Sequence, residues 1–177
     1  MFSSYPELEP IRKEIEGKRI AIVGNASTIF EKQNGEKIDN HDFVIRFNRG
    51  FICDPKCQGS KTSLLILACP MNDYEAKSFK AKYIANRSKS YKNAYANFTI
   101  NNLQRAIMKE CLGSQPSSGF MAINICLYFK AAKVDLYGFD WISQSWPNDP
   151  KYQTLHDYNK ERGVIMGWQS VGLVSIY

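Results

Sequence analysis

Residues 20–50 read IAIVGNASTIFEKQNGEKIDNHDFVIRFNRG, and this stretch decides the fold. The apolar run 20–23 is short enough for a buried strand of a parallel sheet, and the small residues after it allow a sharp turn close to a ligand. A second apolar run, 43–47, ends in Asn48, much as the first is followed by Asn25. Parallel strands end at one edge of an open sheet, where α/β folds bind ligands. The pattern predicts a ligand crevice at that edge, but it fits ordinary turn residues equally well.

Strand and helix patterns alternate along the rest of the chain. Predicted strands are 18–24, 42–48, 62–68, 82–86 and 133–138. Predicted helices are 7–16, 72–80, 99–112 and 120–132, together with a short one opened by a capping box of Thr28 and Glu31. Residues 87–97 are polar and basic, and we predict a solvated loop there rather than a lid or an acceptor surface. The alternation predicts a single α/β domain, residues 1–177, with an open, mostly parallel sheet and helices on both faces, which is a Rossmann-like arrangement.

The composition indicates which classes of partner the protein could bind and in which compartment we expect it. The chain of 177 residues carries a net charge of +6, which fits an anionic partner such as a nucleotide, a phosphorylated sugar, an acidic lipid headgroup or nucleic acid. No apolar run approaches the roughly 20 residues that span a bilayer, and the N-terminal segment lacks the apolar core of a signal peptide. The five cysteines lack zinc-site spacing and fit reduced thiols. We therefore expect a cytoplasmic protein, for which peripheral membrane contact stays open.

Residues 116–119 read PSSG and precede a predicted helix. The first N–H groups of a helix lack partners inside it, and together with the helix dipole they attract phosphate. On these residues alone, we favour the interpretation that Ser117 and Ser118 are plain N-cap residues. Gly138 ends the predicted strand 133–138, so we expect it at the same edge of the sheet as the two asparagines.

Three stretches resemble the motifs of one enzyme family. VGNAST…IDNHDFVIRFN, residues 23–48, resembles the long motif of the animal-type sialyltransferases, glycosyltransferase family 29, in which V-G-N-S precedes I-D-x-H-D-F-V-x-R-x-N. PSSGF…VDLYGF, residues 116–139, resembles the short motif of that family. His156 and Glu161 have the H-x4-E spacing of its very short motif. The three stretches occur in the order that the family shows.

The resemblance implies a fold, a reaction and a set of site residues. The fold would be a variant of the GT-A glycosyltransferase fold. The reaction would be an inverting transfer of sialic acid, or a similar acidic sugar, from a CMP-sugar donor to a glycan hydroxyl, with no metal and no cofactor. His156 would be the catalytic base, and His41 would be structural. The implied substrate-binding residues are Asn25, Ser27, Asn48, Ser117, Ser118, Gly119 and Gly138.

Two features depart from the family pattern. The family has a His/Tyr-rich motif that neutralises the leaving phosphate, but residues 141–155 contain no histidine, and Tyr152 would have to substitute. Secreted members join the long and short motifs by a disulfide. The aligned positions here are Ile20 and Ala131, for which we expect an apolar contact instead.

Alternative functions are weighed against the transferase. A non-catalytic nucleotide- or glycan-binding module with the same crevice stays open. An RNA-binding protein is less favoured, because no aromatic-rich sheet motif of that class is present. A nicotinamide-binding domain is excluded, because the residues from Gly24 onward lack the G-x-G-x-x-G spacing. The oligomeric state stays open.

Overall fold

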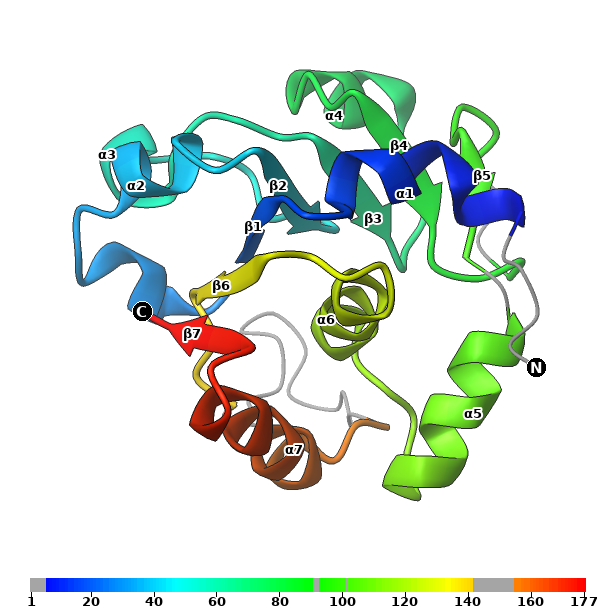
Figure 1. The fold of residues 1–177 in the computed structure, drawn as a ribbon. Coiled ribbons are helices and arrows are strands. Elements are labelled where there is room, and N and C mark those ends of the chain that lie inside the picture. Colours follow the sequence, from blue (N-terminus) through cyan, green and yellow to red (C-terminus); the bar gives the residue numbers. More distant parts are fainter. Residues whose placement is uncertain (1–5, 91–92, 101, 142–154) are drawn as a thin grey trace.

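The computed structural model describes residues 6–90, 93–100, 102–141 and 155–177 (Figure 1). Within these ranges seven strands form one sheet in the order β5-β4-β3-β2-β1-β6-β7, and all neighbouring strands are parallel. The open, parallel α/β fold predicted from the sequence is therefore confirmed. The strands are β1 Arg19–Val23, β2 Phe43–Phe47, β3 Leu64–Leu67, β4 Tyr83–Asn86, β5 Phe98–Thr99, β6 Lys133–Tyr137 and β7 Val174–Ile176.

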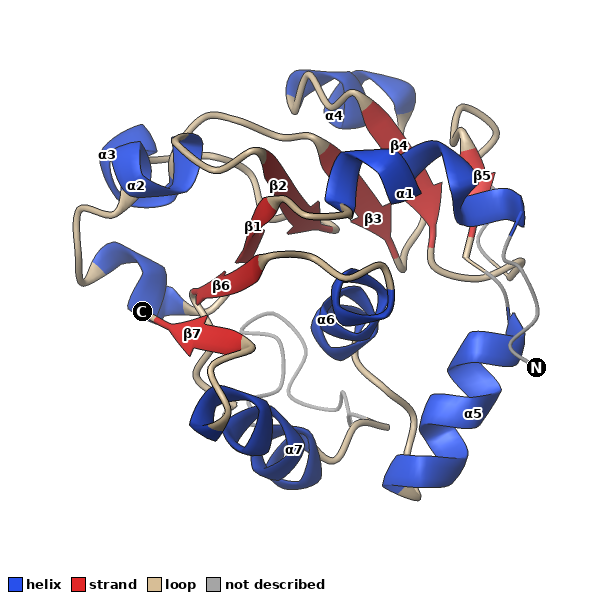
Figure 2. Ribbon diagram, viewed as in Figure 1, coloured by secondary structure: helices blue, strands red, loops and turns tan. Residues whose placement is uncertain are grey.

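Helices cover both faces of the sheet (Figure 2). Successive side chains of β1 point to opposite faces, so Ile20 and Ile22 enter the main core, whereas Ala21 and Val23 enter a second cluster. The main core contains residues of η1, α1, α6 and α7, and the second cluster contains residues of η2 and α2. The helices are η1 Pro6–Leu8, α1 Glu9–Ile15, η2 Ser27–Phe30, α2 Gly35–Asp39, α3 Pro55–Gln58, α4 Asp73–Ser78, α5 Asn102–Leu112, α6 Ser118–Tyr128 and α7 Tyr158–Ser170.

One local prediction is wrong, and another holds in part. Thr28 does not open a helix with a capping box, because it lies inside the 3-10 helix η2, whose N-cap residue Ala26 makes no side-chain cap. The predicted loop is present in residues 87–90 and 93–97, but Ser88 and Asn93 within it are buried; residues 91–92 lie outside the described residues. The short strands β5 and β7 were not predicted, because two or three residues are too few to show a strand periodicity.

Buried polar side chains fasten the segments that flank the sheet. His41 Nε2 bonds Asp135 Oδ2 at 2.9 Å, and its Nδ1 lies 2.9 Å from the Lys37 carbonyl oxygen, so its role is structural. Arg46 donates from its guanidinium to the carbonyl oxygens of Gln58 at 2.7 Å and Lys61 at 3.1 Å. Burial lowers the pKa of Arg46 to about 10, which still leaves it charged at neutral pH. These bonds hold the segments before and after β2 against the sheet.

The positions aligned with the family's disulfide lie in one core. Ile20 is fully buried in the main cluster, and Ala131 is partly buried and packs against that cluster. All five cysteines are free thiols. In the described ranges, no helix combines the length and apolar character that crossing a membrane would require.

The ends of β1 and β6 approach so closely that they leave no room for a side chain at Gly24. Its N–H donates to the Tyr137 carbonyl at 2.7 Å, and a Cβ there would lie 2.3 Å from the Gly138 carbonyl oxygen. We expect Gly24→Ala to lower the free energy of unfolding, measured by urea denaturation, by about 1–3 kcal/mol through overpacking.

Gly163→Ala is the matched control, because a Cβ at this position in α7 meets nothing within 4 Å. Alanine favours a helix over glycine, so the control should keep or raise stability. Equal stability of the two variants would contradict the close approach of the two strands.

Candidate active site

The strand order reverses between β1 and β6, and this switch point forms the centre of the site. In open α/β sheets, ligands bind outside the carboxyl ends of the strands at such a reversal. Gly138 follows β6 with φ +67, and its carbonyl accepts from the Ala26 N–H at 3.2 Å. The loops after β1 and β6 therefore lie together at the edge where the sequence predicted a crevice.

Two amide side chains at this edge have fixed orientations. Asn25 Nδ2 donates to the Phe47 carbonyl at 3.2 Å. Asn48 has a left-handed φ of +49, which asparagine tolerates, and its Oδ1 accepts from the Ala68 N–H at 2.7 Å. A Cβ at Gly50 would lie 2.1 Å from Asn25 Oδ1, so a larger residue there would displace the Asn25 amide. Within the described residues, the amide oxygen of Asn25 and the amide nitrogen of Asn48 keep their hydrogen-bonding capacity for a ligand.

The start of α6 lies at the same edge. A Cβ at Gly119 would lie 2.7 Å from the ring of Phe139, and that ring also lies 3.2 Å from where a Cβ of Gly24 would be. Phe139 therefore connects the helix start with the switch point. In the first turn, Ser117 accepts from the N–H of Phe120 at 3.1 Å, and the N–H groups of Ser118 and Gly119, which have no hydrogen-bond partner among the described residues, would suit an anion.

Glu161 fastens α7 to the start of α6. Its Oε1 accepts from the Ser117 N–H at 2.6 Å, and its Oε2 accepts from the Ser117 hydroxyl at 2.7 Å. Glu161 is only 2% exposed, and burial raises its pKa, although the bonds from Ser117 oppose this shift. Both donors of Ser117 are occupied, so in this structure Ser117 links two helices instead of presenting its donors to a ligand.

His156 precedes α7 and contacts the same segment. Its Nδ1 lies 2.8 Å from the Gln115 carbonyl oxygen. A carbonyl only accepts, so Nδ1 carries the proton and the lone pair of the neutral ring is on Nε2. Burial lowers the pKa of His156, the bond to Gln115 opposes that shift, and the charge of Arg87 lowers it further. The ring is therefore neutral near pH 7, which is the form that accepts a proton.

Arg87 is a site residue that the sequence reasoning missed. It directly follows β4, and its N–H donates to the Leu67 carbonyl at 2.8 Å, which places it at the carboxyl edge of the sheet. Its positive charge acts on both His156 and Glu161. A charged residue immediately after a predicted strand was the signal that could have identified it.

The structure brings together most of the implied site residues. Gln115 and Ser117 contact His156 and Glu161, and Phe139 links this group to Gly24, next to Asn25. Ser27 begins η2 with an exposed side chain that makes no hydrogen bond to other described residues. Tyr152 lies outside the described residues. A separate cavity of about 660 Å³ lies at the opposite edge of the sheet, lined by Arg19, Gln33, Asn34, Glu36, Lys37 and Asn40.

The sequence profile of glycosyltransferase family 29 (sialyltransferase) matches residues 2–90. Human CMP-N-acetylneuraminate-beta-galactosamide-alpha-2,3-sialyltransferase 1 is 24% identical over 216 aligned residues, covering 97% of this chain and 61% of the human protein. The pig protein of the same name is 25% identical over 203 residues, covering 90% of this chain and 58% of its own length. The chain thus spans about three fifths of the length of these curated relatives.

Solved structures share the fold. A mammalian sialyltransferase in complex with Gal-beta-1-3GalNAc-ortho-nitrophenol superposes with a TM-score of 0.70 at 19% identity, covering 99% of this chain and 74% of that chain. The sialyltransferase CstII from Campylobacter jejuni, in complex with the substrate analogue CMP-3FNeuAc, has a TM-score of 0.62 at 12% identity, covering 90% and 79%. These matches agree with the predicted variant of the glycosyltransferase fold.

The buried Glu161 carboxyl predicts a particular pH dependence of stability. Its pKa is raised above 4.5 in the folded state, so the folded state holds this proton more tightly than the unfolded state does. Its contribution to the free energy of unfolding is therefore greatest at low pH and is lost as pH rises from 4.5 through the raised pKa. In Glu161→Gln this contribution is absent.

Urea denaturation of wild type and Glu161→Gln between about pH 4 and 7 measures the effect. The free energy of unfolding of wild type minus that of the variant should fall as pH rises. Glu110→Gln, which removes an exposed carboxylate from α5, controls for the loss of one charge. A difference that rises with pH would show that the carboxylate is not buried against Ser117 as described.

Proposed function

Because the chain belongs to glycosyltransferase family 29, the sialyltransferases, we propose that it transfers sialic acid, or a similar acidic sugar, from a CMP-sugar to a glycan hydroxyl. The transfer inverts the anomeric carbon and uses neither a metal nor another cofactor. The observation that carries the proposal is the joint attachment of His156 and Glu161 to residues 115–117. This attachment supports the proposal, because the His156 imidazole then lies near a helix start whose N–H groups would bind an anion.

The donor fits the polar groups at the carboxyl edge. The N–H groups of Ser118 and Gly119 would hold the anionic part of the donor, phosphate or carboxylate. Asn25 Oδ1 would accept from a ribose hydroxyl, and Asn48 Nδ2 would donate to an oxygen of the nucleotide. Gly138 would lie beside the nucleotide at the end of β6, and its lack of a side chain lets the backbone pack against Gly24 and Ile29. The CMP-3FNeuAc bound to CstII supports this class of donor, and the Gal-beta-1-3GalNAc compound bound to the mammalian enzyme supports a glycan acceptor.

The proposed reaction needs one base and stabilisation of one leaving group. His156 Nε2 takes the proton of the acceptor hydroxyl while the hydroxyl oxygen attacks the anomeric carbon. The bond to the phosphate breaks, and CMP leaves with the bonding electrons. The positive charge of Arg87 and the N–H groups at the start of α6 stabilise the negative charge that develops on the departing phosphate. The cytoplasmic location remains a proposal from the sequence, with which five free thiols are compatible.

The proposal predicts that His156→Ala separates transfer from binding. With CMP-sialic acid and a Galβ1-3GalNAc acceptor, the variant should lose at least about 100-fold in turnover, as expected for removal of a general base. Its affinity for CMP, measured by calorimetry, should stay close to that of wild type, because the base faces the acceptor hydroxyl.

Asn159→Ala is the matched control, because Asn159 is an exposed residue of α7 three positions away. It should keep both activity and affinity. Transfer by His156→Ala at the wild-type rate would remove His156 as the base. A wild-type protein that binds CMP but transfers nothing to any of a panel of acceptors would favour the non-catalytic binding module.

A further inference from the structure

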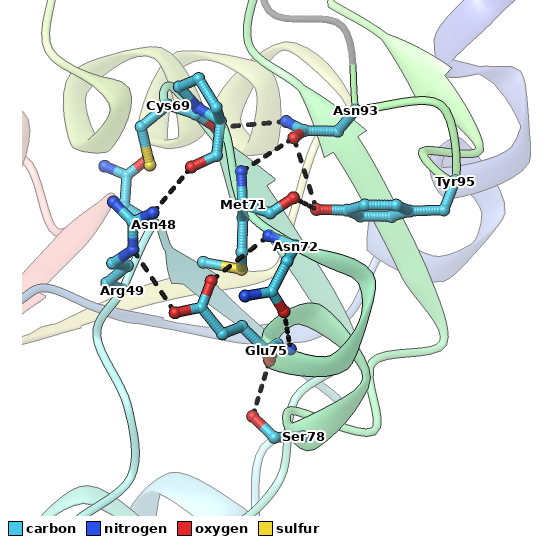
Figure 3. A network of polar contacts seen from close by, with 10 residues as sticks. Asn48, Arg49, Cys69, Met71, Asn72, Glu75, Ser78, Asn93 and Tyr95 are labelled. Atoms are coloured by element: carbon cyan, nitrogen blue, oxygen red, sulfur yellow. Dashed lines mark hydrogen bonds and ion pairs between the residues drawn. The ribbon is translucent and has the colours of Figure 1, made fainter.

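Asn93, between β4 and β5, is a buried amide that bonds its neighbours through both its oxygen and its nitrogen, and Figure 3 shows its contacts with Cys69, Met71 and Tyr95. Its Oδ1 accepts from the Met71 N–H at 3.0 Å, and the Tyr95 hydroxyl oxygen lies 3.4 Å from it. Its Nδ2 donates to the Cys69 carbonyl at 3.2 Å and to Asn86 Oδ1 at 2.8 Å. Asn93 is 6% exposed, so any of these bonds that is lost leaves a desolvated polar group behind. Such an amide holds its neighbours in one arrangement.

The neighbours that Asn93 holds belong to the segment directly after β3. It binds the carbonyl of Cys69 and the N–H of Met71, and the Tyr95 hydroxyl donates to the Met71 carbonyl at 2.6 Å. On the other side of this segment, the Arg49 guanidinium donates to the Pro70 carbonyl at 3.0 Å. Residues 69–71 are therefore fixed by side chains from two directions, as Figure 3 shows.

This segment sets the orientation of the Asn48 amide. The Ala68 N–H donates to Asn48 Oδ1 at 2.7 Å, and Cys69 Sγ approaches the same oxygen at 3.8 Å. An amide can turn by 180° and exchange its acceptor for its donor when nothing fixes it. Two donors on Oδ1 prevent this turn and leave Nδ2 as the group that faces a ligand. Displacement of residues 68–69 would remove that preference.

We propose that Asn93 is a positioning residue of the donor site, which acts through residues 68–71 to keep Asn48 Nδ2 aimed at the nucleotide. The inference rests on the proposed function, because it takes Asn48 as a ligand of the CMP-sugar. It assigns Asn93 and Tyr95, which precede β5, to the support of the donor site. Asn93 itself touches no substrate.

Calorimetric titration with CMP tests the inference. It compares four proteins: wild type, Asn93→Ala, Asn48→Ala and the double variant. Asn93→Ala should raise the Kd for CMP about 3- to 10-fold, which is the net value of one hydrogen bond. In the Asn48→Ala background the same substitution should change the Kd by less than about 2-fold, because its route of action is gone. A loss of stability alone would not produce this dependence on Asn48.

Two further variants keep the test clear. Tyr95→Phe removes only the hydroxyl that bonds Met71, so it should weaken CMP binding in the same direction and by less than Asn93→Ala. Asn97→Ala is the control, because Asn97 is exposed and its Oδ1 accepts from the Ile84 N–H at 2.7 Å, away from residues 68–71. It should leave the Kd unchanged. Urea denaturation confirms that each protein is folded at the titration temperature.

The possible failures are distinguishable. If Asn48→Ala leaves the Kd for CMP unchanged, the proposed donor site is wrong. If Asn48→Ala weakens binding but Asn93→Ala does not, Asn93 has no positioning role. The inference is also wrong if Asn93→Ala weakens binding equally with and without Asn48.

Discussion

The two hydrogen bonds between the Glu161 carboxylate and Ser117 are the interaction on which the site depends. They join helices that come from distant parts of the chain, and they hold the start of α7 at the carboxyl edge of the sheet. His156 precedes α7 by two residues, so the position of its ring follows from that of the helix. A buried carboxylate carries a desolvation cost, and two short bonds to one residue offset it. Contacts within the protein therefore set the position of His156, the proposed base, without a bound ligand.

The second constraint is the close packing of backbone at the switch point. Gly24 and Gly138 approach without side chains between them, and Phe139 fills the space against Gly119. These contacts bring β1, β6 and the start of α6 to one place, which is why residues from the long and short motifs meet. Arg87, which follows β4 two strands beyond β2, adds a positive charge to this edge of the sheet. The family's phosphate-neutralising histidine has no counterpart in residues 141–155, and Arg87 brings positive charge to the same edge.

The sequence allowed the strands and the edge of the site to be predicted, because apolar runs followed by Asn25 and Asn48 are local signals. It could not show which atom of each amide faces a ligand, since the Ala68 N–H that fixes Asn48 comes from the segment after β3, which is distant in the sequence. Asn93 lies in a polar stretch that gave no sign of burial, because its partners come from other loops. The capping-box spacing at Thr28 was also ambiguous. The same spacing at Asn72 and Glu75 forms a box, and at Thr28 and Glu31 it does not.

The central proposal is that the carboxyl edge of the sheet holds a cytidine nucleotide beside His156. A crystal structure of the protein with CMP tests it most directly. The account predicts the nucleotide within hydrogen-bonding distance of Asn48 Nδ2 and of the N–H groups of Ser118 and Gly119, with His156 facing the space where the sugar would follow. CMP bound at the opposite edge of the sheet, in the cavity beside Arg19 and Lys37, with the Asn48 amide making no contact to it, would contradict the account.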